Sequence, residues 1–422
     1  LAVSFKINLL RHSSFLVPSL LFIIIFISDD TLTFGTNANK LYIYSKYLIY
    51  CVIFILLLIK FGKKKLVHQS TLYLFAILIA IFSTALVNFD FRLDGYGYQI
   101  MIIALAFLIT QFLKIKQFLF IFNRYVYILC IISILVFIVA NSFSWVLFYF
   151  PINENVIGNK FVNLYISGVF SDFDKIRNTG IFREPGVFMI YILMGIIIEL
   201  FYCDKMNIKH LSSYFIALFT TFSTAAFIIL FVLCMGYLFR ENSKVPTKYK
   251  FLILSFIGIF IGILIFNDVI YATVFSKLHP DTANPSSFSR LVSIVSDFRT
   301  FMDNPILGSG YSNYSVLFQA HSEQYLGVFI PGLCSTNPFM YIFAMYGFLY
   351  GAILIFAFWR LTARFTEVMR VQFVLFLSFL LMFSNECMNL SLLFNTLVFF
   401  GLKSEPEIFK SRSHAKLDAC EI

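Results

Sequence analysis

Long apolar runs separated by short polar segments fill most of the chain, and this pattern predicts its elements. A helix of roughly 15–20 apolar residues is long enough to cross a bilayer. The runs predict twelve membrane-spanning helices, near residues 13–28, 42–59, 71–87, 98–113, 125–140, 184–202, 211–221, 223–239, 251–267, 337–357, 371–384 and 389–402. The predicted fold class is therefore an all-α polytopic integral membrane protein, with residues 1–422 forming a single membrane-embedded domain.

The apolar stretch 211–239 is long for one helix and short for two, and the placement of charge decides between them. If it forms two helices, seven segments fall on one side of the membrane and hold 22 of the 32 Lys and Arg residues: 1–12, 60–70, 114–124, 203–210, 240–250, 358–370 and 403–422. Lys and Arg concentrate in short cytoplasmic loops. We therefore predict two helices here, both termini in the cytoplasm, and a cytoplasmic tail at 403–422.

This topology leaves two long external loops, at 141–183 and 268–336. Loops of this length in a compact protein are usually functional or disordered. Both loops mix Tyr and Phe with polar and charged residues, and this aromatic content argues against disorder. We predict that both loops fold as caps on the membrane domain.

Composition agrees with a membrane protein: 60% of the residues are apolar and 13% are charged, whereas a soluble domain carries about 25% charged residues. The net charge of +10 therefore indicates orientation in the membrane, and we expect no nucleic-acid partner. Nearly all mid-span positions are apolar. Lys46 is the main exception, and we expect its long side chain to extend outward to the membrane surface.

Candidate chemistry begins at the end of the first loop, in Arg177-Asn-Thr-Gly-Ile-Phe-Arg183-Glu184-Pro-Gly186, directly before an apolar run. Ionisable groups at the lip of a span are costly and usually functional. The glycine and the Pro-Gly pair predict a turn that fixes these charges before a helix begins. A guanidinium can bind two phosphate oxygens at once, so the stretch indicates an anion site. The alternative is that such arginines bind lipid headgroups and acidic neighbours.

The second loop adds Arg290 and Arg299, which are nine residues apart. This spacing is about 2.5 helical turns, so on one helix the two side chains point to opposite sides. Only one of them is then expected to face a pocket. The following stretch, from Asp303 through Gly308-Ser-Gly310 to Tyr311, predicts a turn that ends one helix and redirects the chain.

Two further polar patches flank predicted helices. Hydroxyl groups of residues 220–224 lie at the tip between two apolar runs, where we favour a structural role for them. Thr336-Asn337-Pro338 predicts a helix start, and helix N-termini attract anions. The glycines Gly308 and Gly310 lack the strand and the third glycine of a nucleotide site. No His, Cys or carboxylate cluster in the sequence has metal-ligand spacing.

The order of these motifs resembles one family. Arg177-x-x-Gly-Ile-Phe-x-Glu-Pro-Gly186 is followed by Arg290-x8-Arg299-x4-Asn-Pro-x-x-Gly308-x-Gly310, and then by Thr336-Asn337-x3-Tyr341-x4-Tyr-Gly. The pattern, over about 175–360, is similar to that of the bacterial O-antigen polymerase (Wzy) family, within the superfamily that also contains the O-antigen ligases. Twelve spans, cytoplasmic termini and two large outer loops match that family as well.

The resemblance implies a metal-independent glycosyltransferase, a polysaccharide polymerase without a cofactor, at the periplasmic face of the bacterial inner membrane. Its substrate would be an undecaprenyl pyrophosphate-linked oligosaccharide, and a chain-length co-polymerase would be a partner beside membrane lipid. By analogy, Arg177, Arg183 and Arg290 clamp the pyrophosphate and Glu184 is the base. The residues expected to bind substrate are Arg299, Thr336, Asn337, Tyr341, Gly308 and Gly310.

Alternatives remain open at this point. An O-antigen ligase would share the donor but transfer the glycan to a lipid A core; many such relatives carry His-Asn where this chain has Thr336-Asn337, which makes a ligase less favoured. His321 is a second candidate base, although an exposed, solvated role is its plainer interpretation. Glu184 can also serve only as an ion-pair partner of Arg177 or Arg183. A flippase or other transporter would instead be expected to place charges mid-span and to have short loops on both sides.

Overall fold

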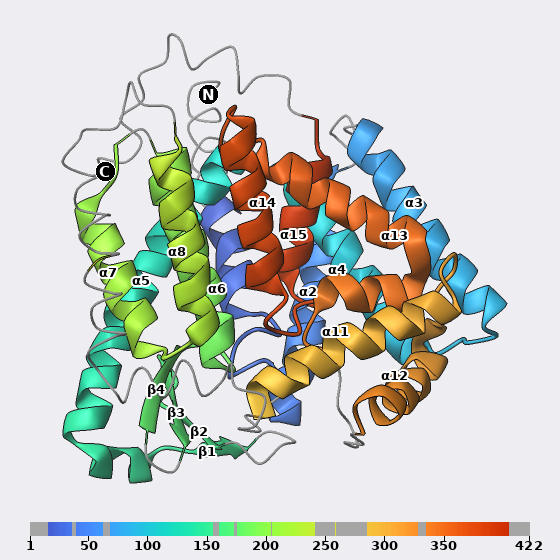
Figure 1. Ribbon diagram of the computed structural model, residues 1–422. Coiled ribbons are helices and arrows are strands. Elements are labelled where there is room, and N and C mark those ends of the chain that lie inside the picture. Colours follow the sequence, from blue (N-terminus) through green and yellow to red (C-terminus); the bar gives the residue numbers. More distant parts are fainter. Residues whose placement is uncertain are drawn as a thin grey trace. The chain divides into compact units, whose positions relative to one another are not determined.

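The computed structural model describes residues 16–35, 39–61, 68–154, 160–172, 175–203, 205–240, 258, 285–327 and 335–404, and most of these are helical (Figure 1). Within these described ranges, six helical stretches are long and apolar enough to cross a membrane: Lys40–Lys60, Gln69–Val87, Leu93–Phe112, Ile115–Ser142, Pro185–Tyr202 and Pro338–Thr362. The chain is therefore a mainly helical protein with several candidate membrane spans, as its apolar pattern predicts.

The predicted spans coincide with helices throughout the described ranges. The longer ones are α2 (Lys40–Phe61), α3 (His68–Val87), α4 (Leu93–Phe112), α5 (Ile115–Ser142), α6 (Pro185–Ile197) with a π-helical end η2 (Ile198–Tyr202), and α13 (Pro338–Thr362). The shorter apolar ones are Leu16–Phe26, α7 (Ile208–Thr220), α8 (Thr224–Leu238), α14 (Met369–Phe383) and α15 (Leu392–Leu402). The predicted span 251–267 lies outside the described residues, and the number of twelve crossings stays a prediction.

The ambiguous stretch 211–239 forms two helices, as predicted. Helix α7 ends at Thr220 and α8 begins at Thr224. Phe222 between them has a φ of 48°, a left-handed conformation that interrupts a helix because a Cβ is crowded there. The hydroxyls of Thr220 and Thr221 donate to the carbonyls of Ala217 and Leu218, both at 2.7 Å. The structural role predicted for the hydroxyls of residues 220–224 is thus confirmed for Thr220 and Thr221.

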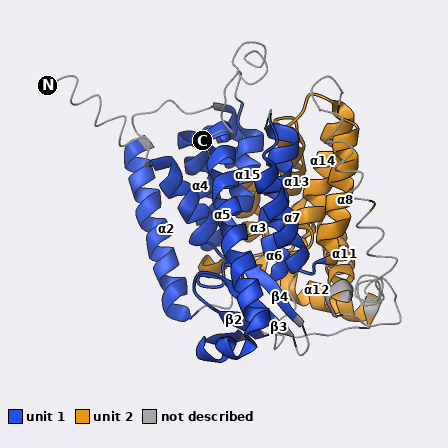
Figure 2. Ribbon diagram, turned by 90° about the vertical axis from the view of Figure 1, so that its left-hand side faces the viewer, with its two compact units in different colours: residues 1–75, 97–223, 390–422 blue, residues 76–96, 224–389 orange. Residues whose placement is uncertain are grey.

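The chain divides into two compact units, which Figure 2 shows in blue and orange. The first comprises residues 1–75, 97–223 and 390–422, and the second comprises residues 76–96 and 224–389. A single membrane-embedded domain over 1–422 was the expectation from the sequence. Each unit is described by itself below.

The first unit contains a small sheet within the long loop 141–183. After a 3₁₀ helix, η1 (Ser144–Tyr149), four antiparallel strands follow in the order β1-β2-β3-β4 (Figure 1). The strands are β1 (Ile152–Glu154), β2 (Lys160–Asn163), β3 (Gly168–Asp172) and β4 (Lys175–Gly180). The loop is folded, as predicted, but its strands make a purely all-α description incomplete.

Two apolar clusters hold this sheet in place. Val162 and Val169 pack with Ala140 at the end of α5, whereas Phe161 and Phe170 pack with Leu32. Side chains alternate between the faces of a strand. Consequently β4 directs Ile176 and Asn178 toward α5, where Asn178 donates to the Ser133 hydroxyl at 3.1 Å, and it presents Arg177 on the opposite face.

The second unit contains the described part of the loop 268–336, which is also folded. It consists of α11 (Pro285–Asp303), a turn, and α12 (Gly310–Leu326). The turn packs against α13 at a kink where Gly347 has a φ of 77°. The Ser309 N–H donates to the Ala344 carbonyl at 2.9 Å, and the Phe348 N–H donates to the Pro305 carbonyl at 2.8 Å. The turn predicted after Asp303 is confirmed.

Candidate functional site

The turn between β4 and α6 places Arg183 and Glu184 beside an early loop of the chain. Gly180 has a φ of 56°, which glycine adopts without steric cost, and the strand therefore turns there. The Leu32 N–H donates to the Ile181 carbonyl, and the Arg183 N–H donates to the Asp30 carbonyl, both at 2.9 Å. Helix α6 then begins at Pro185, where a proline needs no N–H partner. The predicted turn before a helix is confirmed.

The partner loop carries Asp29 and Asp30, two adjacent carboxylates that follow the helix Leu16–Phe26. Asp30 is only 1% exposed. Its Oδ2 atom accepts hydrogen bonds from the Tyr191 hydroxyl on α6 at 2.7 Å and from the Ser391 hydroxyl before α15 at 2.6 Å. Buried carboxylates are expensive unless they are hydrogen-bonded or paired. Three segments of the first unit therefore meet at the Asp30 side chain.

The pKa of the Asp30 carboxyl lies above the usual value for aspartate. Burial is the largest cause, since it disfavours the charged form. The hydrogen bond from Ser391, the positive charge of Arg183 and the hydrogen bond from Tyr191 all lower the pKa, but together they do not offset burial. The charge of Asp29 adds a smaller upward contribution. Asp30 and Arg183 thus interact electrostatically inside the first unit.

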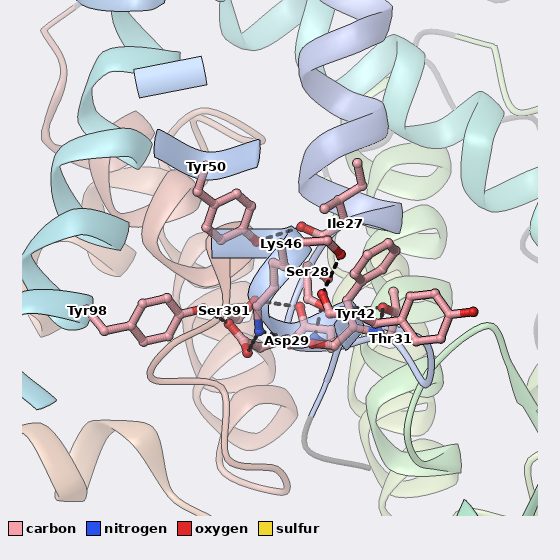
Figure 3. A network of polar contacts seen from close by, with 12 residues as sticks. Ile27, Ser28, Asp29, Thr31, Tyr42, Lys46, Tyr50, Tyr98 and Ser391 are labelled. Carbon is pink, nitrogen blue, oxygen red and sulfur yellow. Dashed lines mark hydrogen bonds and ion pairs between the residues drawn. The ribbon is translucent and has the colours of Figure 1, made fainter. Parts of the chain in front are cut away.

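Asp29 has a different set of partners (Figure 3). Its carboxylate forms an ion pair with Lys46 of α2 and accepts a hydrogen bond from the Tyr98 hydroxyl of α4. Lys46 is only 1% exposed and also donates to the Phe34 carbonyl at 3.0 Å. The prediction that Lys46 extends outward was wrong, because the half-buried Asp29 carboxylate lies within its reach and replaces water as its partner.

Arg177 binds backbone carbonyls at the end of α7. Its Nε donates to the Thr221 carbonyl at 3.0 Å and its Nη2 to the Phe222 carbonyl at 3.4 Å. The guanidinium also lies over the Phe170 ring, with its carbon 5.6 Å from the ring centroid. The last carbonyls of a helix carry partial negative charge, so a cation stabilises them. Arg177 therefore has a structural task that the sequence did not reveal.

Glu184 occupies the N-cap position of α6, with extended backbone angles and no capping hydrogen bond from its side chain. Its side chain is half-buried. Among the described residues Glu184 forms no ion pair, so the predicted alternative of pairing with Arg177 or Arg183 is not found there. A carboxylate next to a helix N-terminus is electrostatically stabilised by the helix dipole.

The second unit holds the other predicted arginines. Arg290 and Arg299 lie on the same helix, α11, as the sequence analysis assumed. Arg299 is exposed and lies over the Tyr325 ring of α12, with its guanidinium carbon 4.4 Å from the centroid. Arg290 is half-buried. Neither arginine belongs to the unit that contains Arg177, Arg183 and Glu184.

Gly308 and Gly310 have backbone reasons to be glycine. Their φ values are 70° and 73°. A Cβ on Gly308 would approach the Met345 carbonyl oxygen to 2.3 Å, far inside van der Waals contact. The close packing of the turn against α13 thus accounts for Gly308, and substrate binding by either glycine stays a prediction.

Thr336, Asn337 and Tyr341 surround the start of α13. The Asn337 side-chain oxygen accepts from the N–H groups of Phe339 and Met340, at 3.1 and 3.2 Å. The helix therefore satisfies those donors itself, and they are not open to a phosphate as the sequence analysis proposed. Thr336 contacts the Ser293 hydroxyl through its N–H and its hydroxyl, at 3.0 and 3.2 Å. Tyr341 packs edge-to-face on Tyr314.

His321 is not the solvated loop residue that the sequence suggested. It lies on α12, its side chain is 13% exposed, and Nε2 is 2.6 Å from the Asp303 carboxylate. Asp303 is the last residue of α11, and the packing of α11 with α12 brings it to His321. His321 therefore serves an ion-pair or hydrogen-bond role within the second unit.

A further buried polar group lies in the first unit, at the π-helical end of α6. Glu199 is 1% exposed, accepts from Asn123 at 2.7 Å, and lies 2.7 Å from Nδ1 of His210. Such π-turns occur frequently at functional sites. Among the described residues no three His, Cys, Asp or Glu side chains are arranged to hold a metal ion.

Four residues of this arrangement were not predicted from the sequence: Asp29, Asp30, Tyr191 and Ser391. The only available signal was the pair of aspartates directly after the first apolar run, which resembles the charged lip before α6. No protein-family model matches the chain, and no curated protein or solved structure matches it either. The function is therefore argued from these residues and their chemistry.

Proposed function

We propose that this protein is a membrane-embedded glycosyltransferase that polymerises O-antigen or another surface polysaccharide. It would transfer the growing glycan from undecaprenyl pyrophosphate onto a new lipid-linked repeat unit, at the periplasmic face of the bacterial inner membrane and with both termini in the cytoplasm. The motif order from Arg177 to Tyr341, similar to that of the O-antigen polymerase family, supports the proposal. The observation that carries it is a buried arginine, Arg183, held beside the N-terminus of α6 by the Asp30 loop.

The proposed reaction is one displacement at the anomeric carbon of the donor sugar. The acceptor hydroxyl oxygen forms the new glycosidic bond, the bond to the pyrophosphate oxygen breaks, and undecaprenyl pyrophosphate leaves with the electron pair. Glu184 takes the proton of the acceptor hydroxyl, because it is the half-buried carboxylate beside Arg183. A general base of this kind contributes about 10²–10⁴-fold to a rate.

Arg183 suits the leaving group. The guanidinium keeps its charge in an apolar surrounding and presents paired N–H donors that match pyrophosphate oxygens. Negative charge grows on those oxygens in the transition state, so a fixed cation stabilises the transition state more than the bound substrate. Arg183 is 8% exposed, and this burial strengthens its electrostatic effect.

We assign the other arginines roles that differ in part from those that the resemblance to the O-antigen polymerase family implies. Two of the five donors of Arg177 are directed at the Thr221 and Phe222 carbonyls just after α7, so we assign it first to positioning the β4–α6 turn. Arg290 remains a proposed clamp residue and Arg299 a weaker one, by analogy with the family alone. A co-polymerase that controls chain length remains a proposed partner.

The alternatives predict different placements of charge and acceptor. A ligase would use a lipid A core as acceptor, and this chain has Thr336 where such relatives carry histidine. A transporter would need ionisable groups along a central path. Lys46 and Glu199 are buried, but Lys46 lies about 9 Å from the start of α2 and Glu199 lies in the last turns of the α6–η2 helix. Charges near helix ends favour a reaction at a surface over a conduit.

The test is reconstitution of the purified protein with synthetic undecaprenyl pyrophosphate-linked repeat units. We expect glycan chains of increasing length and release of one undecaprenyl pyrophosphate for each new linkage, without added nucleotide. If the glycan is transferred only to added lipid A core, and the repeat units are not joined to one another, the protein is a ligase. If units cross the bilayer without any new linkage, it is a transporter, and the proposal is wrong.

A further inference from the structure

Helix α11 distributes its side chains in the opposite way to a surface helix of a soluble protein, which buries apolar residues and exposes polar ones. Four polar side chains on its packed face are fully buried: Ser293, Ser296, Asp297 and Thr300. The other face carries an apolar stripe of four side chains that are 46–55% exposed: Leu291, Ile294, Phe298 and Met302. A contiguous exposed apolar surface of this kind marks an interaction site.

The polar face of α11 has partners within the second unit. The Asp297 carboxylate accepts hydrogen bonds from the hydroxyl of Tyr314 on α12, at 2.7 Å, and from the hydroxyl of Ser335. The Ser293 hydroxyl accepts from the Thr336 N–H at 3.0 Å. Buried polar groups that lose such partners cost free energy. These hydrogen bonds therefore fix how α11 is turned about its axis, and they keep the apolar stripe on the outside.

Arg290 and Arg299 lie on the two borders of the apolar stripe. At about 100° per residue, the stripe covers an arc of about 80°, and the two arginines fall about 90° to either side of its centre. Arg299 is exposed and Arg290 is half-buried. Long cationic side chains at the borders of an apolar helix face contact the apolar surface with their stems and reach lipid phosphates with their charged ends. The spacing of nine residues thus gives both arginines a partner of the same kind.

The apolar stripe continues onto a candidate membrane span. Ile306, in the turn after α11, is exposed, and so are Phe348 and Leu349 of α13. The Phe348 N–H donates to the Pro305 carbonyl at 2.8 Å and joins the two surfaces. Helix α13 is long and apolar enough to cross a membrane, so its exposed apolar side chains are expected to face lipid. Within the same unit, α11 lies crosswise to α8 and α14 (Figure 1), as a helix in the plane of a membrane surface would.

We propose that α11 is a lipid-binding helix of the membrane–water interface. Its apolar stripe contacts acyl chains, and Arg290 and Arg299 bind lipid phosphates on either side. This inference goes beyond the proposed function and does not depend on it, since no sugar substrate enters the test. A clamp role of Arg290 agrees with it, because the pyrophosphate of a lipid-linked donor lies at the level of the headgroup phosphates.

The experiment uses full-length proteins with a single tryptophan, reconstituted in lipid vesicles. Trp145→Phe and Trp359→Phe remove the two native tryptophans. Phe298→Trp then places a reporter in the apolar stripe, and Met302→Trp is a second stripe reporter in case the first does not fold. Glu323→Trp, at an exposed polar position of α12, is the control. Quenching is measured with lipids brominated in the upper acyl chain and with acrylamide in the water, and the thermal midpoint identifies folded variants.

We expect brominated lipid to quench the stripe reporters more strongly than the control, and acrylamide to quench them less. If acrylamide quenches the stripe reporters as it quenches the control, and brominated lipid does not, the stripe faces water and the inference is wrong. If neither quencher reaches either stripe position, another segment of the chain or a second copy covers the stripe, and the inference is wrong as well.

The role of the arginines is tested with the same stripe reporter. Brominated phosphatidylglycerol, which is anionic, is compared with brominated phosphatidylcholine at the same mole fraction. We expect the anionic lipid to be enriched near the reporter on the order of fivefold. Combined Arg290→Gln and Arg299→Gln should abolish this enrichment, whereas Arg370→Gln, on an exposed arginine of α14, should keep it. Equal quenching by both lipids, or an enrichment that survives the paired replacement, would show that these arginines do not bind lipid phosphates.

Discussion

Two arginine-bearing segments of this protein use their polar residues in different ways. In the first unit, the turn between β4 and α6 places Arg183 beside the buried Asp30 carboxylate. In the second unit, the turn between α11 and α12 is held by backbone contacts with α13, and Arg299 lies exposed over an aromatic ring. Both segments contain residues of the same sequence pattern, but the arginine is buried in the first, whereas Arg299 in the second is exposed.

The difference teaches how to separate structural from functional residues within one motif. Gly308 is explained by its left-handed backbone and by the nearby Met345 carbonyl, and Asn337 is explained by the cap that it forms on α13. Arg183 differs from both, because it is a cation that is only 8% exposed, and burying an arginine is costly to a fold. The following changes break or sharpen this comparison, from the largest expected effect to the smallest.

Arg183→Ala should lower the polymerisation rate by about 10²–10³-fold, the effect of removing one preorganised charge-stabilising group. Membrane abundance should stay normal, since the β4–α6 turn is fixed by backbone hydrogen bonds. The measurement is the initial rate of glycan extension per unit of folded protein. Arg370→Ala, on an exposed arginine of α14, is the matched control. A normally inserted Arg183→Ala protein with wild-type rate would contradict the clamp.

Gly308→Ala should act on the fold instead. The left-handed backbone and the overlap with the Met345 carbonyl are expected to cost about 2–4 kcal/mol together. The readout is the thermal midpoint in detergent and the amount of protein in the membrane. Gly97→Ala is the control, because a Cβ there meets nothing within 4 Å. A stable Gly308→Ala protein without activity would show that Gly308 contributes to substrate binding.

Arg177→Ala should lower both the stability and the rate. Loss of the hydrogen bonds to Thr221 and Phe222 is expected to cost about 1.5–3 kcal/mol, with a smaller fall in rate per folded protein than Arg183→Ala gives. Parallel measurement of thermal midpoint and rate separates the two effects. An inactive Arg177→Ala protein of unchanged stability would show that Arg177 is a clamp residue, as the sequence alone suggested.

Asn337→Ala should lower stability by about 1 kcal/mol, the typical value of an N-cap side chain. Asn337→Ser should restore most of this stability, because serine also caps helices. The rate per folded protein should be unchanged in both variants. If the serine variant is stable but slow, the amide of Asn337 contacts substrate and the structural explanation is incomplete.

The smallest effect concerns the membrane position of η1. Trp145 and Tyr149 are 59% and 79% exposed directly after the apolar helix α5, and such aromatic residues collect at membrane interfaces. In a Trp359→Phe protein, Trp145 is the only remaining tryptophan. We expect lipids brominated near the carbonyl group to quench its fluorescence more strongly than lipids brominated deep in the chain. Absence of quenching would place η1 away from the bilayer.

The apolar pattern predicted the apolar helices well because each one coincides with a continuous run of apolar residues in the sequence. Charge placement also predicted the break between α7 and α8, and the glycine and Pro-Gly signals predicted the turn before Arg183. The strands β1–β4 were missed because they are short and lack a sustained alternation. Asp30 was missed because its partner Arg183 lies far away in the sequence, and no local pattern reveals such a contact.

Some structural roles were readable in hindsight. Asn337 before Pro338 fits an N-cap followed by proline at the first helical position, so the capping role was predictable and competes with an anion site. Lys46 was misjudged because its partner, Asp29, comes from the preceding loop. A lysine within a span is paired or solvated, and the sequence does not distinguish the two.

The most direct test of the central claim is the surface polysaccharide of a strain that lacks this gene, resolved on a silver-stained gel. The proposed polymerase predicts that the long ladder disappears and that the core carries a single repeat unit, with the ladder restored by the wild-type gene but not by Arg183→Ala. Loss of every repeat unit, with lipid-linked polymer accumulating in the membrane, would contradict polymerisation and indicate a ligase.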